Sequence, residues 1–85
     1  MITVRALGSI GKTLGQDSFI FNDDSMMLII LLRKIFNNEG KNGDFSGILS
    51  ELIIAINGVA VSTKINEFIL KSGDKVTLIP ISHGG

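Results

Sequence analysis

The residues of this 85-residue chain with the clearest potential for chemistry are Gly84 and Gly85 at its end, preceded by Ser82 and His83. Glycine has no Cβ atom, so a Gly-Gly end can enter a narrow channel in backbone conformations that other residues avoid. An α-carboxyl group has an ordinary pKa of about 3.3 to 3.7 and is ionised at neutral pH. We therefore expect the Gly85 carboxylate to be the reacting group.

The rest of the sequence contains few groups that could do chemistry. It has no cysteine and one histidine, and it shows no recognisable catalytic triad, metal-ligand cluster or phosphate loop. We expect no metal, no cofactor bound to the chain itself and no catalytic activity of its own. His83 is interpreted as a solvated tail residue, with steering of the tail or partner binding as the alternative.

Composition excludes several classes of function. Eight basic and eight acidic residues cancel, and the basic ones are scattered, which argues against nucleic acid as a partner. The longest apolar run, residues 26–32, has seven residues, whereas a membrane span needs roughly 20. No secretory leader and no cysteine are present, so we expect one cytoplasmic domain.

The N-terminal half of the sequence predicts two strands and a helix. Residues 1–7 alternate between apolar and polar side chains, and residues 18–21 form a short aromatic and branched run, so we expect a hairpin joined by a loop at 9–15. Polar residues 22–25 could cap a helix at 25–36, with Met26 and Met27 filling the core. That helix is apolar on nearly all sides, so its outer side is either covered by the loop at 37–50 or open to a partner.

The C-terminal half predicts three more strands. Asn57-Gly58 between the apolar runs at 52–56 and 59–61 is the strongest short hairpin signal, and it requires a positive φ at Gly58. Residues 65–70 fit either one helical turn or an irregular link. A turn at 72–74 then leads into a last strand at 75–81.

This order of elements predicts an α+β fold with one mixed sheet packed on one main helix. A right-handed crossover over the sheet is required where strands run parallel. A β-grasp satisfies both conditions. We expect the domain to cover residues 1–81 and residues 82–85 to form a flexible tail.

Three segments resemble the MoaD and ThiS group of ubiquitin-like β-grasp sulfur carriers, and together with the order of elements the likeness covers the whole chain. They are Ile56-Asn57-Gly58-Val59, Leu70-Lys71-Ser72-Gly73-Asp74-Lys75-Val76 and the ending Pro80-Ile81-Ser82-His83-Gly84-Gly85. The sequence departs from the group's pattern at Ser72, Ile81 and His83. These departures leave the terminal carboxylate unchanged but could alter which partner accepts the tail.

The resemblance implies a reaction at the tail. An E1-like adenylyltransferase would transfer AMP from ATP-Mg to the Gly85 carboxylate, with Gly84 giving access. Sulfur from a persulfide donor protein would then displace AMP and leave a thiocarboxylate. Our first hypothesis is the small subunit of molybdopterin synthase, which carries sulfur for molybdenum cofactor biosynthesis and binds the synthase large subunit.

Other functions stay open. A ubiquitin-like modifier of the archaeal or Urm type, which can also serve tRNA thiolation, is the second hypothesis. A thiamin thiazole carrier is the third, disfavoured because those chains tend to be shorter and to lack the long middle loop. A β-grasp interaction module without tail chemistry is an alternative from a different class.

Strand alternation predicts where partners bind. If Val76 and Leu78 face the helix, Thr77, Ile79 and Ile81 face outward. Ile53 and Ala55 of the neighbouring strand would join this outer face. The partner-binding residues that we predict are Ile53, Ile79, Ile81, Ser82 and His83.

Overall fold

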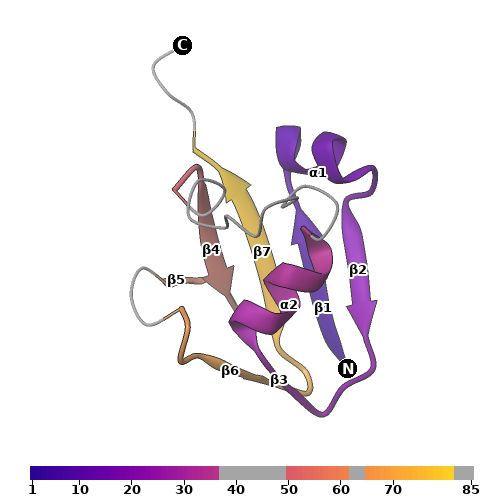
Figure 1. Cartoon of the computed structure of the whole chain (residues 1–85), viewed down its shortest axis with the longest axis vertical. Helices are drawn as coiled ribbons and strands as arrows, with labels where there is room; N and C mark the ends of the chain where they lie inside the picture. The colour runs from indigo at the N-terminus through magenta and orange to yellow at the C-terminus, as the bar shows by residue number, and fades with distance from the viewer. Residues whose placement is uncertain (37–49, 62–64, 82–85) are drawn as a thin grey trace.

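The computed structural model describes residues 1–36, 50–61 and 65–81, and the chain forms one mixed sheet with a helix packed on one face (Figure 1). The elements follow the chain in this order: β1 (Ile2–Ala6), α1 (Gly8–Leu14), β2 (Ser18–Phe21), β3 (Ser25–Met27), α2 (Leu28–Ile35), β4 (Leu52–Ile56), β5 (Val59–Val61), β6 (Ile69–Lys71) and β7 (Lys75–Pro80). None of the described helices is long and apolar enough to span a membrane.

The first and last strands lie side by side at the centre of the sheet. The strand order is β2-β1-β7-β4-β5, in which β1 and β7 run parallel and the other neighbours run antiparallel. Strands β3 and β6 form a separate two-stranded sheet. The predicted α+β fold with a mixed sheet on one main helix is thus confirmed.

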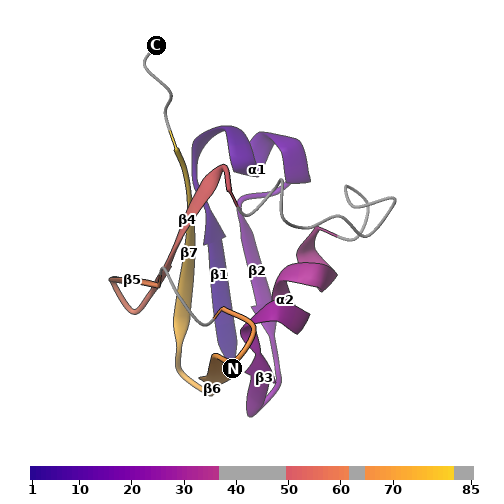
Figure 2. The same ribbon diagram turned by 60° about the vertical axis from the view of Figure 1, so that its left-hand side comes forward.

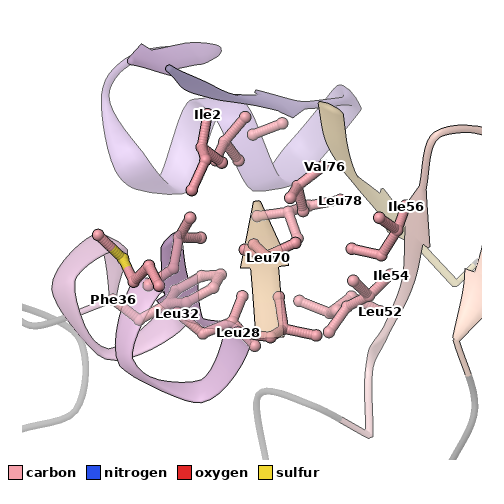
Figure 3. Close-up of a cluster of buried hydrophobic side chains, with 14 residues drawn as sticks. Ile2, Leu28, Leu32, Phe36, Leu52, Ile54, Ile56, Leu70, Val76 and Leu78 are labelled. Atoms are coloured by element: carbon pink, nitrogen blue, oxygen red, sulfur yellow. The ribbon is translucent and has the colours of Figure 1, made fainter. Parts of the chain in front are cut away.

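The core lies between the sheet and α2 (Figure 3). Val4 of β1 pairs with Val76 of β7, and both are almost completely buried. From α2, Leu28, Leu31 and Leu32 are fully buried against them. Burying one such side chain stabilises the fold by about 1.5 to 3 kcal/mol, and packed apolar side chains must stabilise this chain without a disulfide.

The start of the main helix differs from the prediction. Residues 25–27 form β3, and α2 begins only at Leu28, with Met27 as an extended N-cap that makes no side-chain capping bond. Met26 pairs with Leu70 across the small sheet and is buried, whereas Met27 is 42% exposed. Pairing with β6 therefore overrides the capping signal, and the prediction that Met27 fills the core is wrong.

The segment expected to be a loop after β1 is the helix α1. Its side chains Ile10 and Leu14, four residues apart, pack against the core, and this is the spacing of one helix face. Gly11 is buried, and a Cβ there would lie 3.0 Å from the Ala6 carbonyl oxygen, so the close packing requires glycine. Gly15 ends the helix with φ +82 and donates its N–H to the last turn.

The predicted Asn57-Gly58 hairpin is confirmed. Asn57 has φ +51 and Gly58 has φ +86, so both central residues have the positive φ that the favoured two-residue turn requires. The segment expected to be a link or a helical turn at 65–70 contains a turn, followed by β6. The last strand ends at Pro80, one residue before the predicted end.

Candidate functional site

Four of the predicted site residues, Ser82, His83, Gly84 and Gly85, lie outside the described residues. The structure does show how the preceding strand β7 is placed. It runs through the centre of the sheet, and its final residue lies at the opposite end of the molecule from the N-terminus (Figure 1). The tail is therefore connected to a central strand.

The end of β7 is held on both sides. The Ile81 N–H donates a hydrogen bond to the Glu51 carbonyl oxygen at 3.1 Å, and the Leu7 N–H donates to the Leu78 carbonyl oxygen at 2.9 Å. The Pro80 ring lies against Gly8 at the start of α1, where a Cβ would come within 3.3 Å of the proline Cγ atom. The described backbone is therefore anchored as far as Ile81.

Apolar side chains lie on the outer face of the sheet beside this point. Ile79 pairs with Ile53 across β7 and β4, and Ile53 and Ile81 are 42% and 36% exposed. Their neighbours Val76 and Leu78 are buried in the core, so the expected outward orientation is found. We call Ile53, Ile79 and Ile81 the tail-side patch; its binding of a partner stays a prediction.

Ala55 differs from the other predicted outer-face positions. It pairs with Thr77 on one side and Ala60 on the other, and it is only 8% exposed. Because it is buried, it adds little accessible apolar surface to the outer face. Figure 2 shows α2 on one side of the sheet, and no described helix covers the opposite side, where the tail-side patch lies.

The rest of this face carries both polar and apolar side chains, among them Ile20, which is 64% exposed. A shallow hollow runs across β2, β1 and β7, and its lining includes Thr3, Arg5, Ser18, Lys75 and Thr77. These side chains contain no pair of carboxylates and no nucleophile beside a base. Within residues 1–36, 50–61 and 65–81, no three His, Cys, Asp or Glu side chains could hold a metal ion together. The described side chains that line this hollow thus show no recognised catalytic arrangement.

Several solved structures share this architecture. A chain of the complex of subunits 1 and 2 of molybdopterin-converting factor from Helicobacter pylori is 25% identical, with a TM-score of 0.58, and the match covers 99% of this chain and 97% of that one. The small archaeal modifier protein 1 of Methanosarcina acetivorans is 18% identical, with a TM-score of 0.71 over 99% and 95% of the two chains. This chain has the ubiquitin-like β-grasp fold.

The thiamine biosynthesis protein ThiS from Geobacter metallireducens also matches, at 15% identity and a TM-score of 0.53, over 98% of this chain and 99% of that one. The structural neighbours therefore include proteins of the MoaD and ThiS group, and the resemblance predicted from the sequence is confirmed. Protein-family models and curated protein sequences give no match to this chain.

Two of the segments that carry the resemblance meet at the other end of the β-grasp domain. The Asn57 side-chain amide donates to Asp74 Oδ1 at 3.0 Å, and its oxygen accepts the Lys75 N–H at 2.9 Å. Asp74 Oδ2 accepts the Lys71 N–H at 2.8 Å. We call the paired side chains of Asn57 and Asp74 the turn clasp. These residues join two turns, and they lie at the end of β7 that is opposite the tail.

The N-terminus is fixed next to the turn clasp. The Met1 amino group donates to the Ser72 hydroxyl, and the Gly73 N–H donates to the Met1 carbonyl oxygen at 2.7 Å. The Ser72 N–H donates to the Asp24 carbonyl oxygen at 2.8 Å. Three segments far apart in the sequence are therefore tied together at this end of the fold.

Two hydrogen bonds lower the pKa of the Asp74 carboxyl. The main cause is the hydrogen bond from the Lys71 backbone N–H, and the second is the bond from the Asn57 side chain. The positive charge of Lys71 also lowers it, whereas slight burial acts in the opposite direction. Both hydrogen bonds favour the ionised carboxylate.

This pKa shift predicts a dependence of stability on pH. A carboxyl with a depressed folded-state pKa stabilises the fold above its unfolded-state pKa, and this contribution is lost as the pH falls through the folded-state pKa. Below about pH 4 we expect the free energy of unfolding of the wild type to fall more steeply than that of Asp74→Asn, which should be less stable at neutral pH. Urea denaturation at a series of pH values measures both; parallel curves would contradict the prediction.

Sequence reasoning missed the residues that anchor the start of the tail. Glu51 acts through its backbone carbonyl, and Gly8 acts through the absence of a side chain, so neither leaves a chemical signature in the sequence. The turn clasp did leave a signal, since Asn57-Gly58 and Ser72-Gly73-Asp74 were both recognised as turns. What the turn signals could not show was that the two turns contact each other.

Proposed function

We propose that this chain is a sulfur carrier of the MoaD and ThiS type, and that its reacting group is the carboxylate of Gly85. The observation that supports this most is the placement of β7. A central strand anchored through Ile81 continues directly into Ser82-His83-Gly84-Gly85, beside exposed apolar side chains and without catalytic groups on that described surface. An anchored strand end presents a tail to a partner enzyme in a defined direction.

The proposed chemistry takes place in the partner's site. A carboxylate oxygen of Gly85 attacks the α-phosphorus of ATP and expels pyrophosphate, which yields an acyl-adenylate. The terminal sulfur of a persulfide then attacks the acyl carbon and expels AMP. A second thiolate cleaves the resulting sulfur–sulfur bond, which releases the thiocarboxylate and leaves a disulfide on the donor. The ATP-Mg belongs to the activating enzyme, so the carrier needs no cofactor.

The dimensions of the tail fit this division of work. Four extended residues after Ile81 reach roughly 13 to 14 Å, because an extended chain spans about 3.3 to 3.6 Å per residue. That length lets the terminal carboxylate enter an active site while the β-grasp domain stays outside. Two glycines at the end remove the side chains that a narrow channel would have to exclude.

For the sulfur acceptor we propose the pterin precursor of molybdenum cofactor, with the chain acting as the small subunit of molybdopterin synthase. The support is the 25% identity and near-complete mutual coverage with a chain from the complex of molybdopterin-converting factor subunits. The partners would be the E1-like adenylyltransferase, the persulfide donor and the synthase large subunit.

A ubiquitin-like modifier is the second candidate, and one observation favours it. The two small archaeal modifier protein 1 structures, from Haloferax volcanii and Methanosarcina acetivorans, give TM-scores of 0.70 and 0.71, higher than the other neighbours named above, at 17% and 18% identity. In that role the same acyl-adenylate would react with a lysine amine and form an isopeptide bond.

Intact-mass analysis of the protein isolated from its own cells tests the proposal. Replacement of one terminal oxygen by sulfur adds about 16 Da, and alkylation of the thiocarboxylate should shift only that species. Covalent adducts to other proteins through Gly85 would favour the modifier role instead. A chain that shows neither form, in cells where the activating enzyme is expressed, would contradict tail chemistry.

A further inference from the structure

The dipeptide Asn57-Gly58 carries a chemical reactivity that the proposed carrier function does not use. In an Asn-Gly sequence the glycine backbone nitrogen can attack the asparagine side-chain carbonyl carbon, because glycine has no side chain to obstruct the approach. Ammonia leaves and a cyclic imide forms. Water then opens the imide to aspartate or isoaspartate, so that one water enters and one ammonia departs overall.

The turn clasp engages the amide nitrogen of the reacting side chain, and the Lys75 N–H engages its oxygen. The amide nitrogen, which would be the leaving group, donates to Asp74 Oδ1 at 3.0 Å, and the amide oxygen accepts the Lys75 N–H at 2.9 Å. Attack requires the two reacting atoms to approach within about 3 to 3.5 Å in an aligned geometry. We expect the two hydrogen bonds to restrain rotation of the Asn57 side chain toward the Gly58 nitrogen, and thereby to slow the attack.

The protection depends on these side-chain partners rather than on burial. Asn57 and Gly58 are exposed, and no atom lies within 4 Å of the position that a Cβ on Gly58 would occupy. Water needed to open the imide therefore has free access. Access of water does not limit the reaction, so protection must come from the restraint on the Asn57 side chain and on the turn backbone.

The product cannot restore the clasp at neutral pH. A carboxylate at position 57 would place a negative oxygen where the amide nitrogen now donates to Asp74, so a hydrogen bond would be replaced by repulsion between two like charges. An isoaspartate would also add one carbon to the backbone of a two-residue turn. Deamidation of Asn57 is thus easier while the turn clasp is open, and its product prevents the clasp from closing again.

We propose that Asn57 is a deamidation site that the turn clasp keeps unreactive, and that reaction there marks irreversibly those chains whose clasp has opened. This inference is independent of the tail chemistry. It concerns the end of the fold opposite the tail, and it holds whether the chain is a carrier, a modifier or an interaction module.

The test compares deamidation of the full chain in mildly alkaline buffer with and without concentrated urea, using peptide mass spectrometry. Asn42-Gly43, the same dipeptide elsewhere in the chain, is the internal reference in urea, where the two sites should react at similar rates. We expect Asn57 to react at least about tenfold more slowly in the native protein than in urea, since reaction requires local opening. Equal rates in the two conditions would overturn the proposal.

Two variants test separately the protection by the turn clasp and the effect of the deamidated product. Asp74→Ala removes the acceptor of the Asn57 amide, so deamidation in native buffer should accelerate severalfold; an unchanged rate in a folded variant would show that the clasp does not protect. Asn57→Asp reproduces the aspartate product and should unfold at lower urea concentration than the wild type at neutral pH. That difference should shrink on acidification, because protonation of one carboxyl removes the repulsion. Equal stability of Asn57→Asp and the wild type at neutral pH would overturn the claim that deamidation prevents the clasp from closing.

Discussion

Deletion of Gly85 should abolish adenylation of the chain while leaving the fold unchanged. The described structure is anchored as far as Ile81, and the deletion leaves every described residue in place. Losing one residue withdraws the carboxylate by roughly 3.3 to 3.6 Å from the α-phosphate of ATP. A misplacement of about 1 Å can cost about 100-fold in rate, so we expect ATP-pyrophosphate exchange with the cognate E1-like enzyme to fall below detection.

Gly84→Leu tests the same site by a different physical effect. It keeps the length of the tail but adds a bulky side chain, so a narrow channel should exclude it even though the carboxylate can still reach. Thermal unfolding of both variants should match the wild type. Retained exchange in the deletion variant would contradict a reacting group at Gly85, whereas retained exchange in Gly84→Leu alone would mean that the channel is wide.

The strands and the main helix could largely be predicted because their patterns have a single physical cause. In β1 and β7, apolar side chains recur at every second residue because one face of the strand is buried. Val76 and Leu78 are buried, as this pattern predicts. The Asn57-Gly58 turn was predictable for the same reason, since few dipeptides adopt two positive φ values without strain.

The errors arose where tertiary contacts decide between local alternatives. Residues 25–27 have good capping and helix-forming side chains, but pairing of Met26 with Leu70 makes them a strand. The helix α1 contains Gly8 and Gly11, which disfavour a helix on propensity alone. It forms because Ile10 and Leu14 reach the core and because Gly11 fits against Ala6.

The candidate site was predictable only in part. Outward orientation of Ile79 follows from alternation, and its cross-strand partner Ile53 could be named as a neighbour from the expected pairing. The burial of Ala55 could not be foreseen, because strand alternation places it on the same outer face as the exposed Ile53. The backbone hydrogen bonds that anchor the start of the tail could likewise not be predicted from the sequence.

Ile79→Asp should leave the domain folded and weaken its binding to the activating enzyme and to the synthase large subunit. Ile79 faces away from the core, so its replacement mainly removes a cross-strand pair worth about 0.2 to 1 kcal/mol. At the centre of an apolar contact, the new carboxylate must lose water without gaining a partner. A loss of about 2 kcal/mol or more, about 30-fold in Kd, is expected.

Ile20→Asp is the matched control for this prediction. Ile20 is also on the outer face and is 64% exposed, but it lies on the edge strand β2 and pairs with Thr3, so two strands separate its position from Ile53. The same chemical change there should leave Kd nearly unchanged in calorimetric titration. Circular dichroism decides whether each variant is folded. Equal weakening by both variants would assign the effect to charge rather than to contact, and unchanged binding of Ile79→Asp would place the docking surface away from the tail-side patch.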